Sequence, residues 1–271
     1  MDRLWRFFAT TILYIVFGIG ALIITVTLIP LAVIFSPSRA QRTRRVRRIN
    51  QLAFRAFVVA GSLLGVFEFI IKNQRVLTRS SGEIIIANHP SLLDVVFLLA
   101  FIENCNCVVK KNLLRNPFLA MQVYFADYIL NDAGDDILQT CVDSLEKGES
   151  VIIFPEGTRT IDKQELTFKR GAAYLMTLSK GVVRPVHITC EPSALGKYDP
   201  WYRIPERRIH YEITALAPID IEPLRNANHM GLPLKTRRLT KYLLDLYREL
   251  EKVGPDRIGA YRDINGIIKP C

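Results

Sequence analysis

A long apolar stretch near the N-terminus places the strongest constraint on how this chain can fold. No charged side chain occurs from Phe7 to Phe35. A single helix of that length, rising about 1.5 Å per residue, would exceed the roughly 30 Å hydrocarbon thickness of a bilayer. We therefore expect lipid contact, either as one tilted span or as a re-entrant helix pair that breaks near Gly18 and Gly20 or near Pro30. A cleaved signal peptide fits less well, because the run is too long and lacks a small-residue cleavage pattern.

A basic segment follows the apolar stretch. It contains Arg39, Arg42, Arg44, Arg45, Arg47 and Arg48. Such a segment tends to lie on the cytoplasmic side, and each arginine near anionic lipid contributes about 1 kcal/mol of attraction. The net charge of +10 would also suit a nucleic-acid partner. Because the basic segment adjoins the apolar stretch, we expect lipid head groups as its partner and no nucleic acid.

Apolar runs and helical patterns alternate along the rest of the chain. The runs lie at 83–87, 107–109, 151–154, 182–188 and 209–216, and the helical patterns at 90–101, 113–126, 134–147, 168–180 and 235–252. This alternation predicts an α/β fold with a mixed, mostly parallel sheet flanked by helices and preceded by an N-terminal membrane-embedded helical segment. Ligands in such folds gather at the carboxyl ends of the strands.

The first polar cluster follows the run at 83–87. It places His89 five residues ahead of Asp94, with Pro90 suited to the first position of a helix. A histidine in this turn can meet the aspartate, which would fix one imidazole tautomer while the other ring nitrogen takes a proton. The spacing therefore permits a general-base dyad. The alternative is a helix-capping histidine with an unrelated surface aspartate.

The second polar cluster follows the run at 151–154. Gly157 offers flexible backbone, Thr158 a hydroxyl and Glu156 a carboxylate. Arg159 carries the forked donor that best matches a phosphate. Alone, this segment could be an ordinary strand-end turn with a solvated arginine. Two such clusters, each following a buried strand, together indicate an acyl-transfer site.

In this order the motifs resemble the glycerolipid acyltransferase family of PlsC-like enzymes, which includes 1-acylglycerol-3-phosphate and other lysophospholipid acyltransferases. The resemblance covers roughly residues 80 to 220. The family's Asn-His-x-x-x-x-Asp motif is matched by Asn88, His89 and Asp94, and its Phe-Pro-Glu-Gly-Thr-Arg motif by residues 154–159. Its Phe-Lys-x-Gly segment and its proline-containing apolar strand match 168–171 and 182–188.

The resemblance implies a membrane-bound acyltransferase. His89 would deprotonate a hydroxyl of a lysophospholipid, which attacks the thioester of acyl-CoA or acyl carrier protein, while Asp94 orients the imidazole. The substrate-binding residues would be Glu156, Gly157, Thr158, Arg159, Lys169, Arg170 and Gly171. Lys169 and Arg170 could equally form a solvated helix start. No cofactor beyond the thioester co-substrate and no metal is expected, and the enzyme would lie at the bacterial inner membrane with its catalytic domain on the cytoplasmic side.

One family motif is altered, which leaves the acceptor open. Members acting on phosphate-bearing acceptors usually carry Gly-x-x-Phe-Ile-x-Arg, whereas the corresponding stretch here, 126–132, has no arginine. The simplest reaction converts 1-acylglycerol-3-phosphate to phosphatidate. A second hypothesis is an acyltransferase of aryl-polyene-type lipid assembly, because the aromatic, turn-rich segment 190–205 resembles that bacterial branch. A third is a non-catalytic, lipid-binding membrane adaptor.

The remaining expectations concern domains and cysteines. Residues 1–72 are predicted to form a membrane-anchoring helical region, and 73–271 a single catalytic domain of ordinary size. Within the first region, 52–71 is predicted to be a helix that lies along the interface or covers the fatty-acyl groove, or else a plain core helix. The five cysteines are expected to be free thiols, most of them buried. His187 is expected to be structural.

Overall fold

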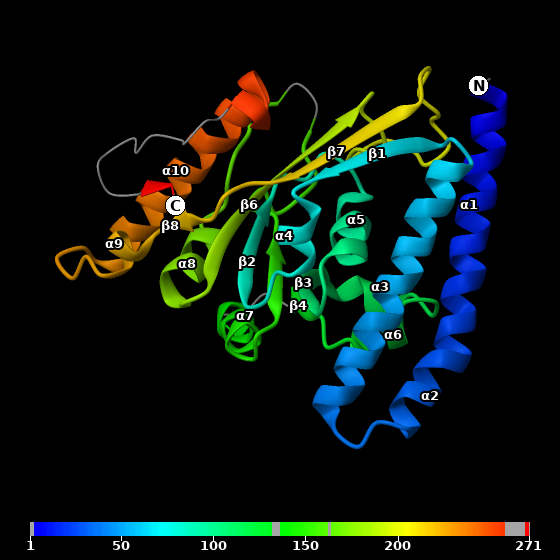
Figure 1. The fold of residues 1–271 in the computed structure, drawn as a ribbon, viewed down its shortest axis with the longest axis horizontal. Coiled ribbons are helices and arrows are strands. Elements are labelled where there is room, and N and C mark those ends of the chain that lie inside the picture. The colour runs from blue at the N-terminus through cyan, green and yellow to red at the C-terminus, as the bar shows by residue number, and fades with distance from the viewer. Residues whose placement is uncertain (1–2, 132–135, 162–163, 258–268, 271) are drawn as a thin grey trace.

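The centre of the fold is a mixed β-sheet, and the two polar clusters follow two of its strands (Figure 1). The computed structural model describes residues 3–131, 136–161, 164–257 and 269–270. Within them the sheet has the strand order β1-β7-β6-β2-β5-β3-β4, while β8 pairs with β6 and β9 pairs with β8. The strands are β1 (Phe67–Lys72), β2 (Glu83–Ala87), β3 (Cys105–Lys110), β4 (Ile129–Asn131), β5 (Ser150–Ile153), β6 (Val182–Glu191), β7 (Ile209–Ala215), β8 (Ile219–Asp220) and β9 (Lys269–Pro270).

Most neighbouring strands run parallel. Strand β2 lies between β5 and β6 and is parallel to both, and β3 is parallel to β5 and β4. The β6–β7, β6–β8 and β8–β9 pairs are antiparallel. The predicted mixed, mostly parallel α/β sheet is therefore confirmed. Each of the five apolar runs identified in the sequence forms a strand.

Helices cover both faces of this sheet (Figure 1). They are α1 (Arg3–Ile23), η1 (Ile24–Leu28), α2 (Ile29–Ile34), α3 (Arg39–Leu63), α4 (Gln74–Thr78), α5 (Asp94–Phe101), η2 (Lys111–Arg115), α6 (Ala120–Phe125), α7 (Asp136–Glu146), α8 (Gly171–Leu178), α9 (Glu222–Arg225), α10 (Leu232–Val253) and η3 (Pro255–Arg257). The predicted helix at 113–126 is divided between η2 and α6. The first residues of the pattern at 134–147 lie outside the described residues.

Strand β2 is covered by helices on both faces, which explains why its central residues are apolar. Successive side chains of a strand point to opposite faces of the sheet. Ile84 and Ile86 pack in one core with residues of α7, α8 and α10, while Ile85 and Ala87 pack in another with residues of α3 and α5. A strand covered by helices on both faces must be apolar at every position. This burial fixes the direction in which β2 delivers the turn that follows it.

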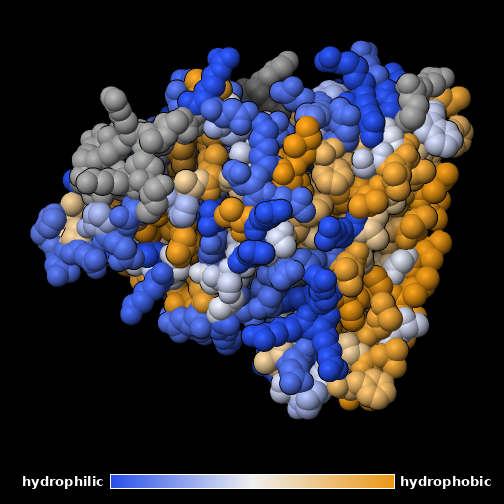
Figure 2. Space-filling model, in the orientation of Figure 1, coloured by the Kyte–Doolittle hydropathy of each residue, from blue (hydrophilic) through white to orange (hydrophobic). Residues whose placement is uncertain are grey.

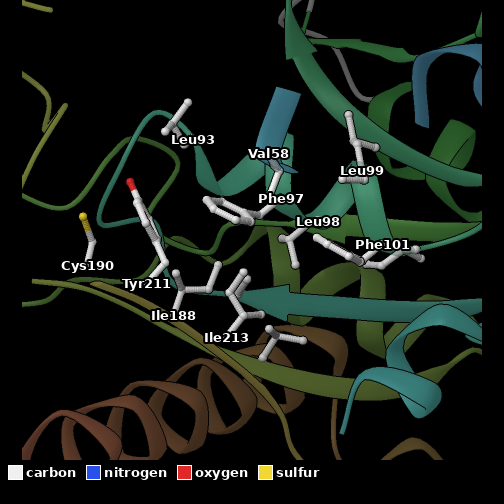
Figure 3. Close-up of a cluster of buried hydrophobic side chains, with 14 of the residues drawn as sticks. Val58, Leu93, Phe97, Leu98, Leu99, Phe101, Ile188, Cys190, Tyr211 and Ile213 are labelled. Carbon is white, nitrogen blue, oxygen red and sulfur yellow. The ribbon is translucent and has the colours of Figure 1, made fainter. Parts of the chain in front are cut away.

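The core on the α5 side is rich in aromatic rings (Figure 3). The ring centroids of Phe97 on α5 and Tyr211 on β7 lie 4.8 Å apart, and Phe67 on β1 contacts both rings. Figure 3 shows the Tyr211 hydroxyl on the side of the cluster near Leu93 and Cys190. The core therefore extends directly beneath the turn that carries His89.

The N-terminal region is an antiparallel helix pair (Figure 1). Helices α1, η1 and α2 form one continuous helical segment, Arg3–Ile34, which is long and apolar enough to cross a membrane. Its outward side chains give the molecule an apolar edge (Figure 2). One of the alternatives, a break near Gly18 and Gly20, is not found, because α1 runs through both glycines. The irregularity is the π-helical turn η1 just before Pro30, whose ring nitrogen has no N–H to donate.

The prediction of a single helix over 52–71 is wrong. Helix α3 ends at Leu63, and Gly65 then adopts a φ of 74°. The N–H of Gly65 bonds to Ser62 O and that of Val66 to Gly61 O, the glycine-dependent bonding pattern that terminates helices. The chain continues as β1, which pairs in parallel with β7. The predicted domain boundary at residue 72 stays a prediction, with β1 inside the sheet.

The arginines of the basic segment lie in different environments. The segment lies in α3, where one face packs on the protein. Arg47 is buried and pairs with Glu149 at 2.9 Å, while its Nε donates to Ala126 O. Arg39 remains exposed and pairs with Asp127. Helical periodicity therefore turns Arg47 into the interior and leaves Arg44, Arg45 and Arg48 exposed.

Candidate active site

His89 and Asp94 meet in the turn between β2 and α5. His89 Nδ1 lies 2.8 Å from Asp94 Oδ2. The helix begins at Asp94, not at Pro90 as the sequence predicts, so residues 88–93 form an extended turn. That turn lets the aspartate, at the first position of the helix, face the imidazole. The geometry of a histidine–carboxylate dyad is therefore present.

Asp94 is completely buried, which shapes its chemistry. Its Oδ2 also accepts the Ser91 N–H at 2.8 Å. Burial raises the pKa of Asp94, and the contact with His89 opposes that shift by favouring the carboxylate. When the carboxylate accepts the Nδ1–H of His89, the imidazole's Nε2 carries the free lone pair. This nitrogen is the atom of the turn suited to accept a proton.

The second polar cluster holds the first in place. Glu156 Oε1 accepts the backbone N–H of His89 at 2.8 Å, and the Thr160 N–H donates to His89 O at 2.7 Å. The ring of Phe154 stacks on the imidazole with 4.1 Å between centroids. Burial raises the pKa of Glu156, which also accepts the Thr160 hydroxyl. Glu156 therefore positions His89 through its backbone.

The remaining residues predicted to bind substrate lie around the turn after β5 and the start of α8. Gly157 has a φ of 67°, and a Cβ there would lie 2.9 Å from side-chain atoms of Lys169. The Lys169 N–H donates to Pro155 O at 2.7 Å, which holds the two segments together. Arg170 and Gly171 are exposed at the start of α8, and Thr158 is half-buried. The structure thus brings Gly157 and Lys169 together, and substrate binding by this set stays a prediction.

Arg159 contacts the loop that follows β6. Its Nη1 donates to Leu195 O at 2.9 Å and to Gly196 O at 2.7 Å, and its Nη2 lies 3.3 Å from Lys197 O. The guanidinium therefore fastens this loop beside the His89 turn. Its predicted contact with an acceptor head group stays a prediction.

Sequence reasoning missed a second set of polar contacts beneath the turn. The Tyr211 hydroxyl donates to Ser91 Oγ at 2.6 Å, and Ser91 Oγ donates to Ala194 O at 2.9 Å. Asn88 bonds Ile188 twice, with its Nδ2 donating to the carbonyl and its Oδ1 accepting the N–H. Asn88 and Ser91 stood inside a recognised segment, but Tyr211 gave no signal because only tertiary packing brings it there.

The described residues offer little support for metal or thiol chemistry. In the ranges that the structure describes, no group of three or more His, Cys, Asp or Glu side chains could hold a metal ion. Cys105, Cys107, Cys141 and Cys190 are free and buried, as expected. Burial raises the pKa of Cys107 to about 12 and that of Cys190 to about 11, which makes both poor nucleophiles at neutral pH.

Comparison with known proteins finds similarity to acyltransferases. The model of the family described as Acyltransferase matches residues 68–189. The chain is 31% identical over 114 residues to a 1-acyl-sn-glycerol-3-phosphate acyltransferase of Helicobacter pylori, which covers 40% of this chain and 48% of that protein. It is 25% identical over 237 residues to 1-acyl-sn-glycerol-3-phosphate acyltransferase alpha of Ovis aries, covering 83% of this chain and 77% of the relative. The match thus spans about half of the bacterial relative's length.

The fold agrees with these relatives. The crystal structure of the 1-acyl-sn-glycerophosphate acyltransferase PlsC from Thermotoga maritima superposes with a TM-score of 0.63 at 16% identity, covering 92% of this chain and 98% of that one. At that identity the likeness concerns the fold. The family match and the named relatives confirm the predicted class of enzyme, an acyltransferase. On these findings residues 68–189 match the Acyltransferase family, and the chain is similar to 1-acyl-sn-glycerol-3-phosphate acyltransferases.

Proposed function

We propose that the protein moves a fatty acyl group from a thioester to a hydroxyl of a lysophospholipid, most simply converting 1-acylglycerol-3-phosphate to phosphatidate. The observation that carries this proposal is the 2.8 Å contact between His89 and the buried Asp94. The similarity to proteins named 1-acyl-sn-glycerol-3-phosphate acyltransferases supports the choice of acceptor.

The proposed reaction uses His89 as a general base. Its Nε2 removes the proton of the acceptor hydroxyl while the oxygen attacks the carbonyl carbon of the thioester. The carbon–sulfur bond then breaks, and the imidazolium gives its proton to the leaving thiolate. Asp94 stabilises that imidazolium through Nδ1. General-base action of this kind contributes about a hundred- to ten-thousand-fold in rate.

The proposed site of action is the cytoplasmic face of a bacterial inner membrane. The apolar helical segment Arg3–Ile34 and its exposed apolar side chains support attachment to lipid. The basic start of α3 supports a cytoplasmic orientation, because positive charge beside a membrane segment favours that side. A topology reporter fused after residue 271 tests this orientation. A signal from the periplasmic side would contradict it.

The test of the reaction uses the full-length protein in detergent or nanodiscs. Lysophosphatidate is supplied with acyl-CoA or with acyl carrier protein thioester, and phosphatidate is measured. We expect transfer with at least one donor and a loss of about a hundred- to ten-thousand-fold in kcat for His89→Ala. His229→Ala, which removes an exposed histidine, is the matched control. An unchanged rate in folded His89→Ala would contradict the proposed base. Transfer no faster than background by the wild type with either donor would favour the adaptor hypothesis.

A second candidate keeps the dyad and changes the acceptor. The stretch 126–132 carries no arginine where phosphate-acceptor enzymes of the family usually have one. This observation favours an acyltransferase of specialised, aryl-polyene-type lipid assembly with a different lipid alcohol. The same assay with a non-phosphorylated acceptor separates the two. Equal turnover of lysophosphatidate and monoacylglycerol would favour the second candidate.

A further inference from the structure

An apolar pocket joins the membrane-facing helix α1 to the catalytic turn. Its walls include Leu13 on α1, Phe67 on β1, Leu93 and Leu195. Leu93 directly precedes Asp94. Leu195 lies on the loop that Arg159 fastens, and its carbonyl also accepts the N–H of Leu92 at 3.1 Å. The pocket therefore lies between the apolar edge in Figure 2 and the His89 turn.

Two polar side chains of α1 line this apolar pocket without using their full hydrogen-bonding capacity. Arg6 is only 3% exposed, and its Nη2 donates to the backbone carbonyl of Glu206. Its Nε and Nη1 have no hydrogen-bond partner within the part of the chain that the structure describes. The hydroxyl of Thr10, one helical turn later on the same face, is also buried and unpartnered there. Both residues line the pocket.

The charge of Arg6 is uncompensated at this position. Among the described residues lining the pocket there is no aspartate or glutamate. The other lining arginine, Arg203, is largely exposed and pairs with Asp199 at 3.0 Å. A buried cation without an anionic partner is costly, so a site that retains one is suited to receive an anion. A guanidinium matches phosphate oxygens in geometry as well as in charge.

We propose that this pocket binds the phosphate group of a single-chain phospholipid acceptor, with Arg6 and Thr10 as its ligands and the acyl chain along the apolar wall. This inference rests on the proposed function, because the bound lipid is the acceptor of that reaction. Arg6 would supply the positive charge that the stretch 126–132 lacks. The acceptor would thus be recognised from the membrane side of the His89 turn.

The direct test measures binding without an acyl donor, so no turnover is needed. Full-length protein in phosphatidylcholine nanodiscs is titrated with lysophosphatidate and, separately, with monoacylglycerol of the same chain. We expect Arg6→Gln to weaken lysophosphatidate binding about ten- to a hundred-fold, the usual effect of losing hydrogen bonds to a charged group, and to leave monoacylglycerol binding unchanged. Arg6→Lys, which keeps the charge, should retain part of the preference.

Arg3→Gln is the matched control, because it removes the same charge from an exposed position on the same helix. It should leave the affinity for both lipids unchanged. Equal weakening by Arg3→Gln and Arg6→Gln would overturn the proposal by showing a general charge effect. Equal loss of both lipids in Arg6→Gln would overturn it by showing a structural effect. If Arg6→Gln does not fold, Thr10→Val replaces it and should weaken only lysophosphatidate, by about three- to ten-fold.

Two competitors identify the source of the phosphate. Inorganic phosphate and a two-chain anionic phospholipid in the nanodisc are each added before the titration. We expect neither to displace lysophosphatidate at an equal concentration or mole fraction. Displacement by either one would overturn the assignment to a single-chain acceptor. Binding is measured without an acyl donor. If the acyl-transfer assay showed no activity, the proposed function would be rejected, but the binding titration would still test whether Arg6 recognises the phosphate.

Discussion

The two turns that end β2 and β5 lie at the same edge of the sheet but use their polar groups differently. The turn after β2 directs an imidazole and a buried carboxylate toward each other at 2.8 Å and leaves one imidazole nitrogen available for chemistry. In the turn after β5, Glu156 and Arg159 bond mainly to backbone groups of neighbouring segments. In the proposed mechanism the first turn carries the reactive groups, and the second turn holds the neighbouring segments in place around them.

This difference shows that the residue types of a motif do not reveal which groups their side chains contact. Both turns contain a carboxylate, and both carboxylates are buried with raised pKa values. Asp94 accepts from a side chain that can change protonation, whereas Glu156 accepts from the backbone N–H of His89. The same chemical group therefore acts on the imidazole in one turn and on the main chain in the other.

The sharpest test of the comparison neutralises each carboxylate in turn. Asp94→Asn should lower kcat by about a hundred- to ten-thousand-fold, because an amide N–H directed at Nδ1 would move the imidazole proton to Nε2. Glu156→Gln should cost less than about ten-fold, since the amide oxygen still accepts the His89 N–H. Steady-state acyl transfer checks both variants. Similar losses in the two would show that the turns do not differ in role.

The second test asks what Arg159 does. Arg159→Met removes the donors that reach Leu195, Gly196 and Lys197, and should lower the free energy of unfolding by about 1–3 kcal/mol. If the arginine only fastens the loop, KM should change equally for lysophosphatidate and monoacylglycerol. A KM increase confined to lysophosphatidate would instead assign it to the head group.

Arg203→Met is the control for stability. Arg203 is 72% exposed and makes a surface ion pair with Asp199. Exposed pairs contribute only about 0–1 kcal/mol, so its unfolding free energy should stay near that of the wild type. Chemical denaturation in detergent measures both variants. An equal loss in Arg203→Met would show that the Arg159 effect is not specific to the bonded loop.

The third test concerns the backbone of the second turn. Gly157→Ala should lower stability by about 1–2 kcal/mol, because its φ of 67° is unfavourable for a side chain. Gly171→Ala is the matched control at the first residue of α8, where a Cβ would meet nothing within 4 Å. It should be neutral or stabilising by up to about 1 kcal/mol. Thermal unfolding measures both variants. Similar shifts in melting temperature would contradict the requirement for glycine at position 157.

The sequence predicted those features of the fold that follow from residues close together in the chain. The strand β2 and the meeting of His89 with Asp94 follow from an apolar run and a short spacing, so both could be anticipated. Strand β1 was missed because its apolar residues continue the pattern of α3. Gly65, at a positive φ, is a local sign of the boundary.

Long-range contacts account for the rest. The guanidinium of Arg159 reaches carbonyls more than thirty residues away along the chain, and Tyr211 meets Ser91 across 120 residues. Arg6 lies in a stretch that the sequence marks only as an approach to the membrane. No periodicity or motif specifies such pairs, because they arise when distant segments pack on one sheet.

The smallest expected effect is a dependence of stability on pH that belongs to Glu156. Burial raises its pKa in the folded protein, so at pH values above the unfolded value of about 4.3 the folded state holds a proton that the unfolded state releases. The contribution of Glu156 to the free energy of unfolding is therefore complete below that pH, and it is lost as the pH rises through the folded pKa.

The variant Glu156→Gln has no titrating group at this position. Asp94 titrates in both proteins, so its contribution cancels in the comparison. The unfolding free energy of the wild type minus that of Glu156→Gln should fall as the pH rises from 4 toward neutrality, by about 1.4 kcal/mol for each unit of pKa shift. A difference that stays constant or grows would mean that Glu156 is charged in the folded protein at no cost, and that its bonds to His89 and Thr160 outweigh burial.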